Sequence, residues 1–101
     1  MIVITYSTVD KFIDNLDPIT RAKTLRAVGR LGKFGPHLSP PDSKKIGKQL
    51  FELRTRSDAQ VRLFYGFWQD KAFVVHAIIK KTGKIPKRDI KLAERRLAAL
   101  A

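Results

Sequence analysis

The chain has 101 residues, the length of one domain, and no break in composition divides it into two. Lysine and arginine number 21 against nine aspartate and glutamate residues, so the net charge of +12 favours a nucleic acid, an anionic membrane surface or an acidic protein as partner. The chain has no cysteine, which excludes disulfides, thiolate metal sites and a cysteine nucleophile, and fits a reducing cytoplasm.

The first third of the chain predicts a strand followed by two helices. Residues 2–6 are apolar and β-branched, which is typical of a short strand. Ser7–Thr8 is expected to cap a first helix, and Asp17–Pro18 to begin a second. The apolar stripe expected on the second helix consists of Ala22, Leu25, Val28 (or Ala27) and Leu31. Residues 36–48, with three prolines, predict a loop.

From residue 49 onward the apolar period changes to two, which predicts an antiparallel meander. Its expected strands are residues 49–56, 61–68 and 72–80. A final helix is expected from Pro86, because Ile90, Ala93, Leu97 and Leu100 recur at three and four. The expected fold class is α+β: an N-terminal strand and α-hairpin packed on the meander, with a C-terminal helix, in one domain spanning residues 1–101.

Neither secretion nor membrane insertion is expected. The N-terminus lacks the basic region and the long apolar core of a secretory signal. The longest strongly apolar run, Ala72 to Ile79, is far shorter than the roughly 20 residues that cross a bilayer. We therefore expect a cytoplasmic protein without a membrane partner.

Strand alternation divides the meander side chains between two faces. The face expected to be apolar and covered by helices carries Phe51, Leu53, Thr55, Leu63, Tyr65, Phe67, Phe73, Val75, Ala77 and Ile79. The other face is expected to carry Glu52, Arg54, Arg56, Arg62, Phe64, Gly66, Trp68, Val74, His76, Ile78 and Lys80. Arginines bind phosphate and aromatic rings stack on unpaired bases, so this second face predicts an RNA-binding surface. The alternative is a solvated face in which Glu52 pairs with Arg54 or Arg62.

A cationic loop follows the last predicted strand. Its cations are Lys80, Lys81, Lys84, Lys87 and Arg88. Loops at a sheet edge often carry functional side chains, and the alternative is a solubilising connector. His76 is a candidate proton carrier near neutral pH, and a structural histidine is the alternative. The sequence has no glycine-rich phosphate loop and no histidine pair or carboxylate cluster for a metal, so we expect no metal and no cofactor.

Three segments of the second half occur in a characteristic order. They are Leu50-Phe51-Glu52-Leu53-Arg54, Val61-Arg62-Leu63-Phe64-Tyr65 and Val75-His76-Ala77-Ile78-Ile79-Lys80-Lys81-Thr82-Gly83-Lys84-Ile85-Pro86. Together with the helix that follows, they resemble the RelE/ParE toxin superfamily, most closely its phage-derived HigB-like branch. The chain departs from that pattern at Val61, Ala77 and Ile78, where an aromatic residue, glycine and phenylalanine are usual.

The resemblance implies the toxin of a type II toxin–antitoxin system. Such a toxin is a metal-independent endoribonuclease that cleaves mRNA on the ribosome, inhibits translation and is silenced in a hetero-oligomer by a helix-turn-helix, HigA-like antitoxin. The alternatives are a ParE-like toxin that inhibits DNA gyrase and a non-catalytic RNA-binding module.

The family motif also suggests which residues form the site. We hypothesise that Arg54 and Arg62 hold the phosphate, and that Lys80 or Lys81 assists proton transfer. His76 is the alternative acid or base. The residues expected to bind RNA are Arg56, Phe64, Tyr65, Lys84, Lys87 and Arg88.

Overall fold

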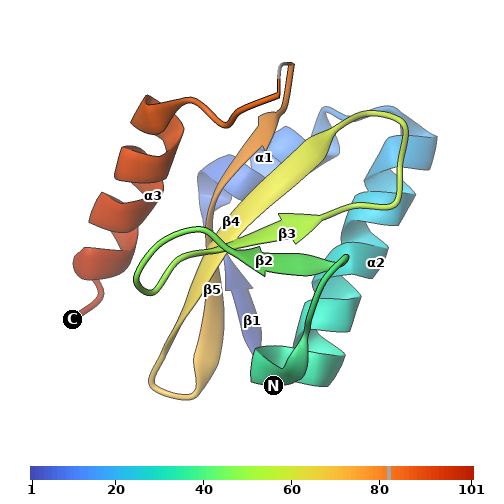
Figure 1. Ribbon diagram of the computed structural model, residues 1–101. Helices are drawn as coiled ribbons and strands as arrows, with labels where there is room; N and C mark the ends of the chain where they lie inside the picture. Colours follow the sequence, from blue (N-terminus) through green and yellow to red (C-terminus); the bar gives the residue numbers. More distant parts are fainter. Residues whose placement is uncertain (82) are drawn as a thin grey trace.

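The computed structural model describes residues 1–81 and 83–101 and arranges them in three layers (Figure 1). The elements in chain order are β1 (Val3–Thr5), α1 (Ser7–Asp14), α2 (Pro18–Phe34), a 3-10 turn (Gly35–His37), β2 (Ser43–Lys45), β3 (Phe51–Arg54), β4 (Val61–Trp68), β5 (Lys71–Ile79) and α3 (Lys87–Ala98). The sheet lies between α3 on one side and α1 with α2 on the other. This arrangement confirms the expected α+β class. Thr82 lies outside the described residues; it belongs to the cationic loop after the last predicted strand, residues 80–88, which we call the exit loop.

The five-stranded sheet has the order β1-β5-β4-β3-β2. β1 joins β5 in parallel, and the other neighbouring strands are antiparallel, so the predicted meander forms the centre of a mixed sheet. β2 corrects the expectation of a loop over residues 36–48, because its three residues pair with β3. A strand this short shows too little alternation to be recognised in the sequence.

The second helix begins as predicted and faces the sheet differently. The Asp17 carboxylate accepts the Thr20 N–H at 3.1 Å, and hydrogen bonds with Thr20 lower the pKa of Asp17. The buried stripe consists of Thr20, Thr24, Ala27 and Leu31. Leu25 is 53% exposed, so its place in the expected stripe is wrong. The Thr24 hydroxyl donates to the Thr20 carbonyl oxygen at 2.8 Å, which satisfies this polar group inside the core.

The first helix, α1, begins without the expected cap. Tyr6 occupies the cap position, and no side chain in the described part of the chain caps the helix, so the prediction for Ser7–Thr8 is wrong. Within the same described part, none of the helices has the length and hydropathy of a membrane-spanning segment.

A bulge in β5 changes which side chains face which layer. Phe64 pairs with His76 but Tyr65 pairs with Val74, so Val75 is the extra residue. Beyond it the alternation reverses: Val74 joins the core under α1 and α2, while Phe73 and Val75 pack under α3. The face assignments expected for these three residues are therefore wrong. An entirely apolar strand carries no alternation from which such a shift could be read.

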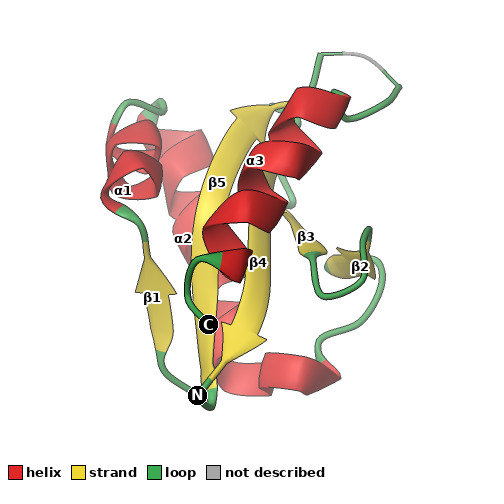
Figure 2. Ribbon diagram, turned by 90° about the vertical axis from the view of Figure 1, so that its left-hand side faces the viewer, coloured by secondary structure: helices red, strands yellow, loops and turns green. Residues whose placement is uncertain are grey.

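Helices lie on both faces of the sheet (Figure 2), and a cluster of buried apolar side chains lies under the helices of each face. The core under α1 and α2 consists of Val9, Ile13, Ala27, Leu31, Leu53, Val61, Leu63, Tyr65, Ala72 and Val74. The core under α3 consists of Leu50, Phe64, Phe73, Val75 and Ala93. The face expected to be cationic is thus divided: α3 covers part of it, and the cations occupy the rest.

Close packing of α3 depends on Gly66. A Cβ atom there would lie 2.8 Å from Leu97 Cδ1 and 2.8 Å from the Gln49 carbonyl oxygen. We expect Gly66→Ala to lower the free energy of unfolding by about 1–3 kcal/mol, because the backbone of Gln49 cannot yield as a side-chain tip can.

Gly29→Ala is the matched control for equilibrium urea unfolding. A Cβ atom at Gly29 meets no described atom within 4 Å, and alanine favours a helix interior, so this variant should be more stable by about 0.5–1 kcal/mol. Equal stability of the two variants would contradict close packing of α3 against Gly66.

Candidate nucleic-acid interface

The candidate interface lies where β3, β4 and β5 pair next to the first turn of α3. Arg54 pairs with Arg62, and Arg62 pairs with Ile78, so the three residues form one row across the sheet. The Lys80 N–H extends this pairing by donating to the Gln60 carbonyl oxygen at 2.7 Å. Two surface pockets open here, which we call the arginine pocket and the lysine pocket.

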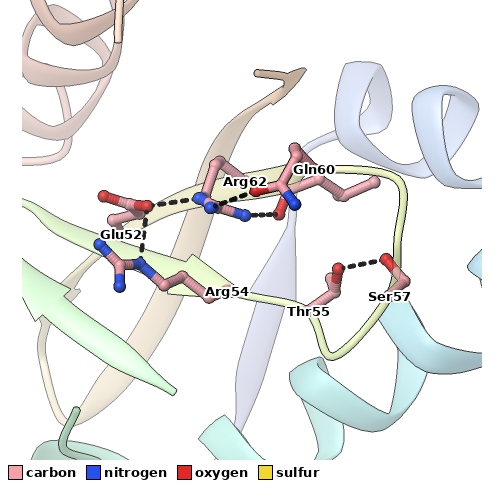
Figure 3. A network of polar contacts seen from close by, with 7 residues as sticks. Glu52, Arg54, Thr55, Ser57, Gln60 and Arg62 are labelled. Carbon is pink, nitrogen blue, oxygen red and sulfur yellow. Dashed lines mark hydrogen bonds and ion pairs between the residues drawn. The ribbon is translucent and has the colours of Figure 1, made fainter. Parts of the chain in front are cut away.

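A buried glutamate organises the arginines (Figure 3). Glu52 is 2% exposed, and its Oε1 accepts the Arg54 Nε–H at 3.1 Å. The Arg62 Nε lies 2.6 Å from the same oxygen, an ion pair without the angle of a hydrogen bond. Arg62 Nη2 donates to Gln60 Oε1 at 2.8 Å and Nη1 to the Val61 carbonyl oxygen at 3.1 Å. The Arg62 guanidinium group is therefore held in place before any ligand binds.

The arginine pocket has a volume of about 190 Å³. It is lined by Pro41, Asp42, Arg54, Thr55, Arg56, Gln60 and Arg62. Arg56 forms a two-pronged contact with Asp42, from Nε to Oδ1 at 3.1 Å and from Nη2 to Oδ2 at 3.0 Å. Three guanidinium groups at one pocket are a donor set suited to phosphate oxygens.

The lysine pocket has a volume of about 290 Å³ and lies on the other side of Ile78. It is lined by Ile78, Ile79, Lys80, Lys81, Lys84, Pro86, Arg88 and Asp89. Four of these residues are cations, so the exit loop does contribute to the cationic surface. In the part of the chain that the structure describes, no three histidine, cysteine, aspartate or glutamate side chains group as metal ligands.

His76 connects the sheet to α3 at the edge of this surface. Its Nε2 lies 2.8 Å from Asp89 Oδ1, and its ring stacks on Phe64 with centroids 5.7 Å apart. Asp89 belongs to the first turn of α3 and lines the lysine pocket. The pair thus fixes the helix start beside the pocket, which is the role expected of a structural histidine. A catalytic role for His76 stays a hypothesis.

The expected roles of two aromatic residues are corrected. Phe64 is 0% exposed beneath α3, and Tyr65 is 1% exposed beneath α1 and α2, so neither ring can stack on an RNA base. Burial raises the pKa of Tyr65 above its usual value of 10.0, while the hydrogen bond with Ser43 acts in the opposite direction. The sequence motif identifies both positions as part of the family pattern. It does not show that they are buried, because their burial depends on which helix covers each face of the sheet.

The remaining predicted residues fall around the two pockets. Arg54, Arg56 and Arg62 meet at the arginine pocket, and Lys80, Lys81, Lys84 and Arg88 meet at the lysine pocket. Lys87 is exposed in the first turn of α3 and lines neither pocket.

Three polar residues at the interface were missed by the sequence reasoning: Asp42, Gln60 and Asp89. Asp42 and Asp89 carried no signal, because their partners are 13 or more residues away in the chain. Gln60 could have been found, since it stands two positions before Arg62, where alternation places side chains on one face.

Comparison with known proteins shows that most of the chain, including this surface, matches a protein family. The family model described as phage-derived protein Gp49-like (DUF891) matches residues 11–98, which include both pockets. No curated protein matches the chain.

The role of Glu52 can be tested by removing its charge. We expect Glu52→Gln to lower the free energy of unfolding by about 2–3 kcal/mol, because the buried Arg62 loses its counter-charge. Glu94→Gln, at an exposed position of α3, is the control and should change stability by less than about 0.5 kcal/mol in urea titrations. If the two variants unfolded at the same urea concentration, Glu52 would not organise the arginines.

Proposed function

Because the chain belongs to the phage-derived Gp49-like family, part of the RelE/ParE-like toxin group, we propose that it is the toxin of a type II toxin–antitoxin system and cleaves mRNA. The observation that carries the proposal is a pair of cationic pockets on neighbouring strands, where Arg62 of one pairs with Ile78 of the other, and the arginines of one pocket are fixed by a buried glutamate. The net charge of +12 supports a polyanionic substrate.

In the proposed reaction the ribose 2′-hydroxyl attacks the adjacent phosphorus, and the bond from phosphorus to the 5′-oxygen breaks. The products are a 2′,3′-cyclic phosphate and a 5′-hydroxyl end. Arg54 and Arg62 bind the non-bridging oxygens and stabilise the charge that develops on them. Since Glu52 and Gln60 already orient Arg62, little reorganisation is required when the phosphate arrives.

The lysine pocket supplies the proton transfers. Lys80, Lys81 and Ile78 line this pocket. Ile78 is the residue of β5 that pairs with Arg62 of β4, so the lysine pocket begins one strand away from Arg62. RNA that crosses Ile78 reaches both pockets. One lysine accepts the proton of the 2′-hydroxyl, and a protonated group returns one to the 5′-oxygen. His76, which Asp89 holds at the edge of this pocket, is the third candidate for these transfers.

We further propose that the protein acts in the cytoplasm without a metal ion, on mRNA bound to the ribosome. Its partner would be a helix-turn-helix, HigA-like antitoxin that binds it in a hetero-oligomer. Membership of the toxin group supports these proposals. A small gene for a helix-turn-helix protein next to this one would strengthen them.

The test compares two charge-matched double variants. Lys80→Ala/Lys81→Ala removes both proposed proton carriers, and the rate of reporter-mRNA cleavage in a translation extract should fall roughly 10²- to 10⁴-fold. Lys11→Ala/Lys33→Ala removes the same charge from exposed positions on α1 and α2 outside both pockets, and should cleave like the wild type.

Two results would overturn the proposal. Equal cleavage by the two variants would remove the lysines from the reaction. Intact reporter mRNA with the wild-type protein, combined with inhibition of DNA gyrase supercoiling, would instead identify a ParE-like toxin.

A further inference from the structure

A third pocket lies against α2, and all four residues that line it are cations. Lys23, Arg26 and Arg30 belong to α2, and Arg56 follows β3. The pocket has a volume of about 180 Å³. Arg56 also lines the arginine pocket, so the two pockets adjoin. Figure 1 shows the connection from β3 to β4 reaching over toward α2. We call this third site the α2 pocket.

The α2 pocket has more donors than acceptors. Asp42 is a carboxylate that pairs with the arginines of this pocket, and both oxygens of Asp42 already accept hydrogen bonds from Arg56. Arg30 Nε lies 3.6 Å from Asp42 Oδ1, too far for a hydrogen bond. Arg30 Nε and Nη2 are buried and donate to no acceptor among residues 1–81 and 83–101. Unsatisfied donors of this kind cost folding free energy, and an added anion would offset part of that cost by supplying negative charge at the pocket.

The spacing of the cations is also unfavourable for the helix. Lys23, Arg26 and Arg30 stand three and four residues apart, so they share one side of α2. Like charges at this spacing destabilise a helix. Arg30 nevertheless keeps only 21% of its side chain exposed, so it is held at the pocket instead of extending into solvent. A cationic side chain that served solubility alone would be free to extend away from its neighbours.

We propose that the α2 pocket binds a phosphate of the RNA backbone. The bound strand then runs from the lysine pocket across the arginine pocket and past Arg56 to α2. Continuity through Arg56 favours a phosphate within a strand over a free phosphate ion. The inference rests on the proposed function for the identity of the polymer, and on the charge and geometry of the pocket for the binding itself.

The experiment measures binding to a short single-stranded RNA whose 2′-hydroxyls are methylated, so that it cannot be cleaved. Lys23→Ala/Arg26→Ala is compared with Lys11→Ala/Lys33→Ala, which has the same net charge. Alanine is the strongest helix former, and Arg26 is exposed, so the pocket variant should fold. Log affinity falls as log salt concentration rises, and losing one phosphate contact should make this fall shallower by about 0.7. If the two variants bind equally at about 1 M salt, the pocket variant then binds about fivefold more weakly at about 0.1 M salt.

The outcomes separate this inference from the proposed function. A reduced slope in the pocket variant alone supports the inference. Equal weakening in both variants shows bulk attraction and overturns it. A rise in melting temperature with inorganic phosphate, together with unchanged RNA affinity of the pocket variant, assigns the pocket to free phosphate and also overturns it. Cleavage by Lys80→Ala/Lys81→Ala is a separate readout, so the proposed function can fail while strand binding at α2 stands, or the reverse.

Discussion

The interface depends on one buried carboxylate. Glu52 is 2% exposed, and it is paired with Arg54 and with the nearly buried Arg62. Removing water from such charges is costly, so the pairing is poor evidence for stability as such. The pairing matters because it fixes the position of Arg62, which lines the arginine pocket and whose guanidinium group is oriented by Gln60. A substrate phosphate then meets donors that are already in position, as electrostatic catalysis requires.

The fold provides the space in which this carboxylate acts. α3 packs on one part of the sheet face and comes close to it at Gly66. The part of the face that α3 covers extends to the first turn of the helix, where Asp89 pairs with His76. The bulge at Val75 turns two apolar side chains of β5 toward α3. Beyond that boundary β3 carries Arg54 and β4 carries the nearly buried Arg62, while Lys80 and Lys81 follow the end of β5. Core and interface therefore share one sheet face, and the first turn of α3 marks the border between them.

Much of this could be predicted from the sequence, and what could not has physical reasons. Alternation in β3 and β4 placed Glu52, Arg54 and Arg62 together. The alternative interpretation paired Glu52 with one arginine on a solvated face, whereas Glu52 is 2% exposed and pairs with both arginines. The same rule failed in β5, because an apolar strand conceals a bulge. Alternation also predicted that Phe64 lies on the exposed cationic face, whereas Phe64 is buried under α3. Alternation shows which face a side chain occupies but not which part of that face a distant helix covers. Asp42 and Asp89 escaped because only tertiary contacts give them partners.

The central claim is that this surface cuts RNA and does not merely bind it. Mapping transcript ends in bacteria after induction of the wild-type protein tests that claim most directly. The account predicts new 5′-hydroxyl ends inside translated coding regions, which disappear from a transcript whose start codon has been removed. Unchanged transcript ends in cells whose growth has stopped would contradict it.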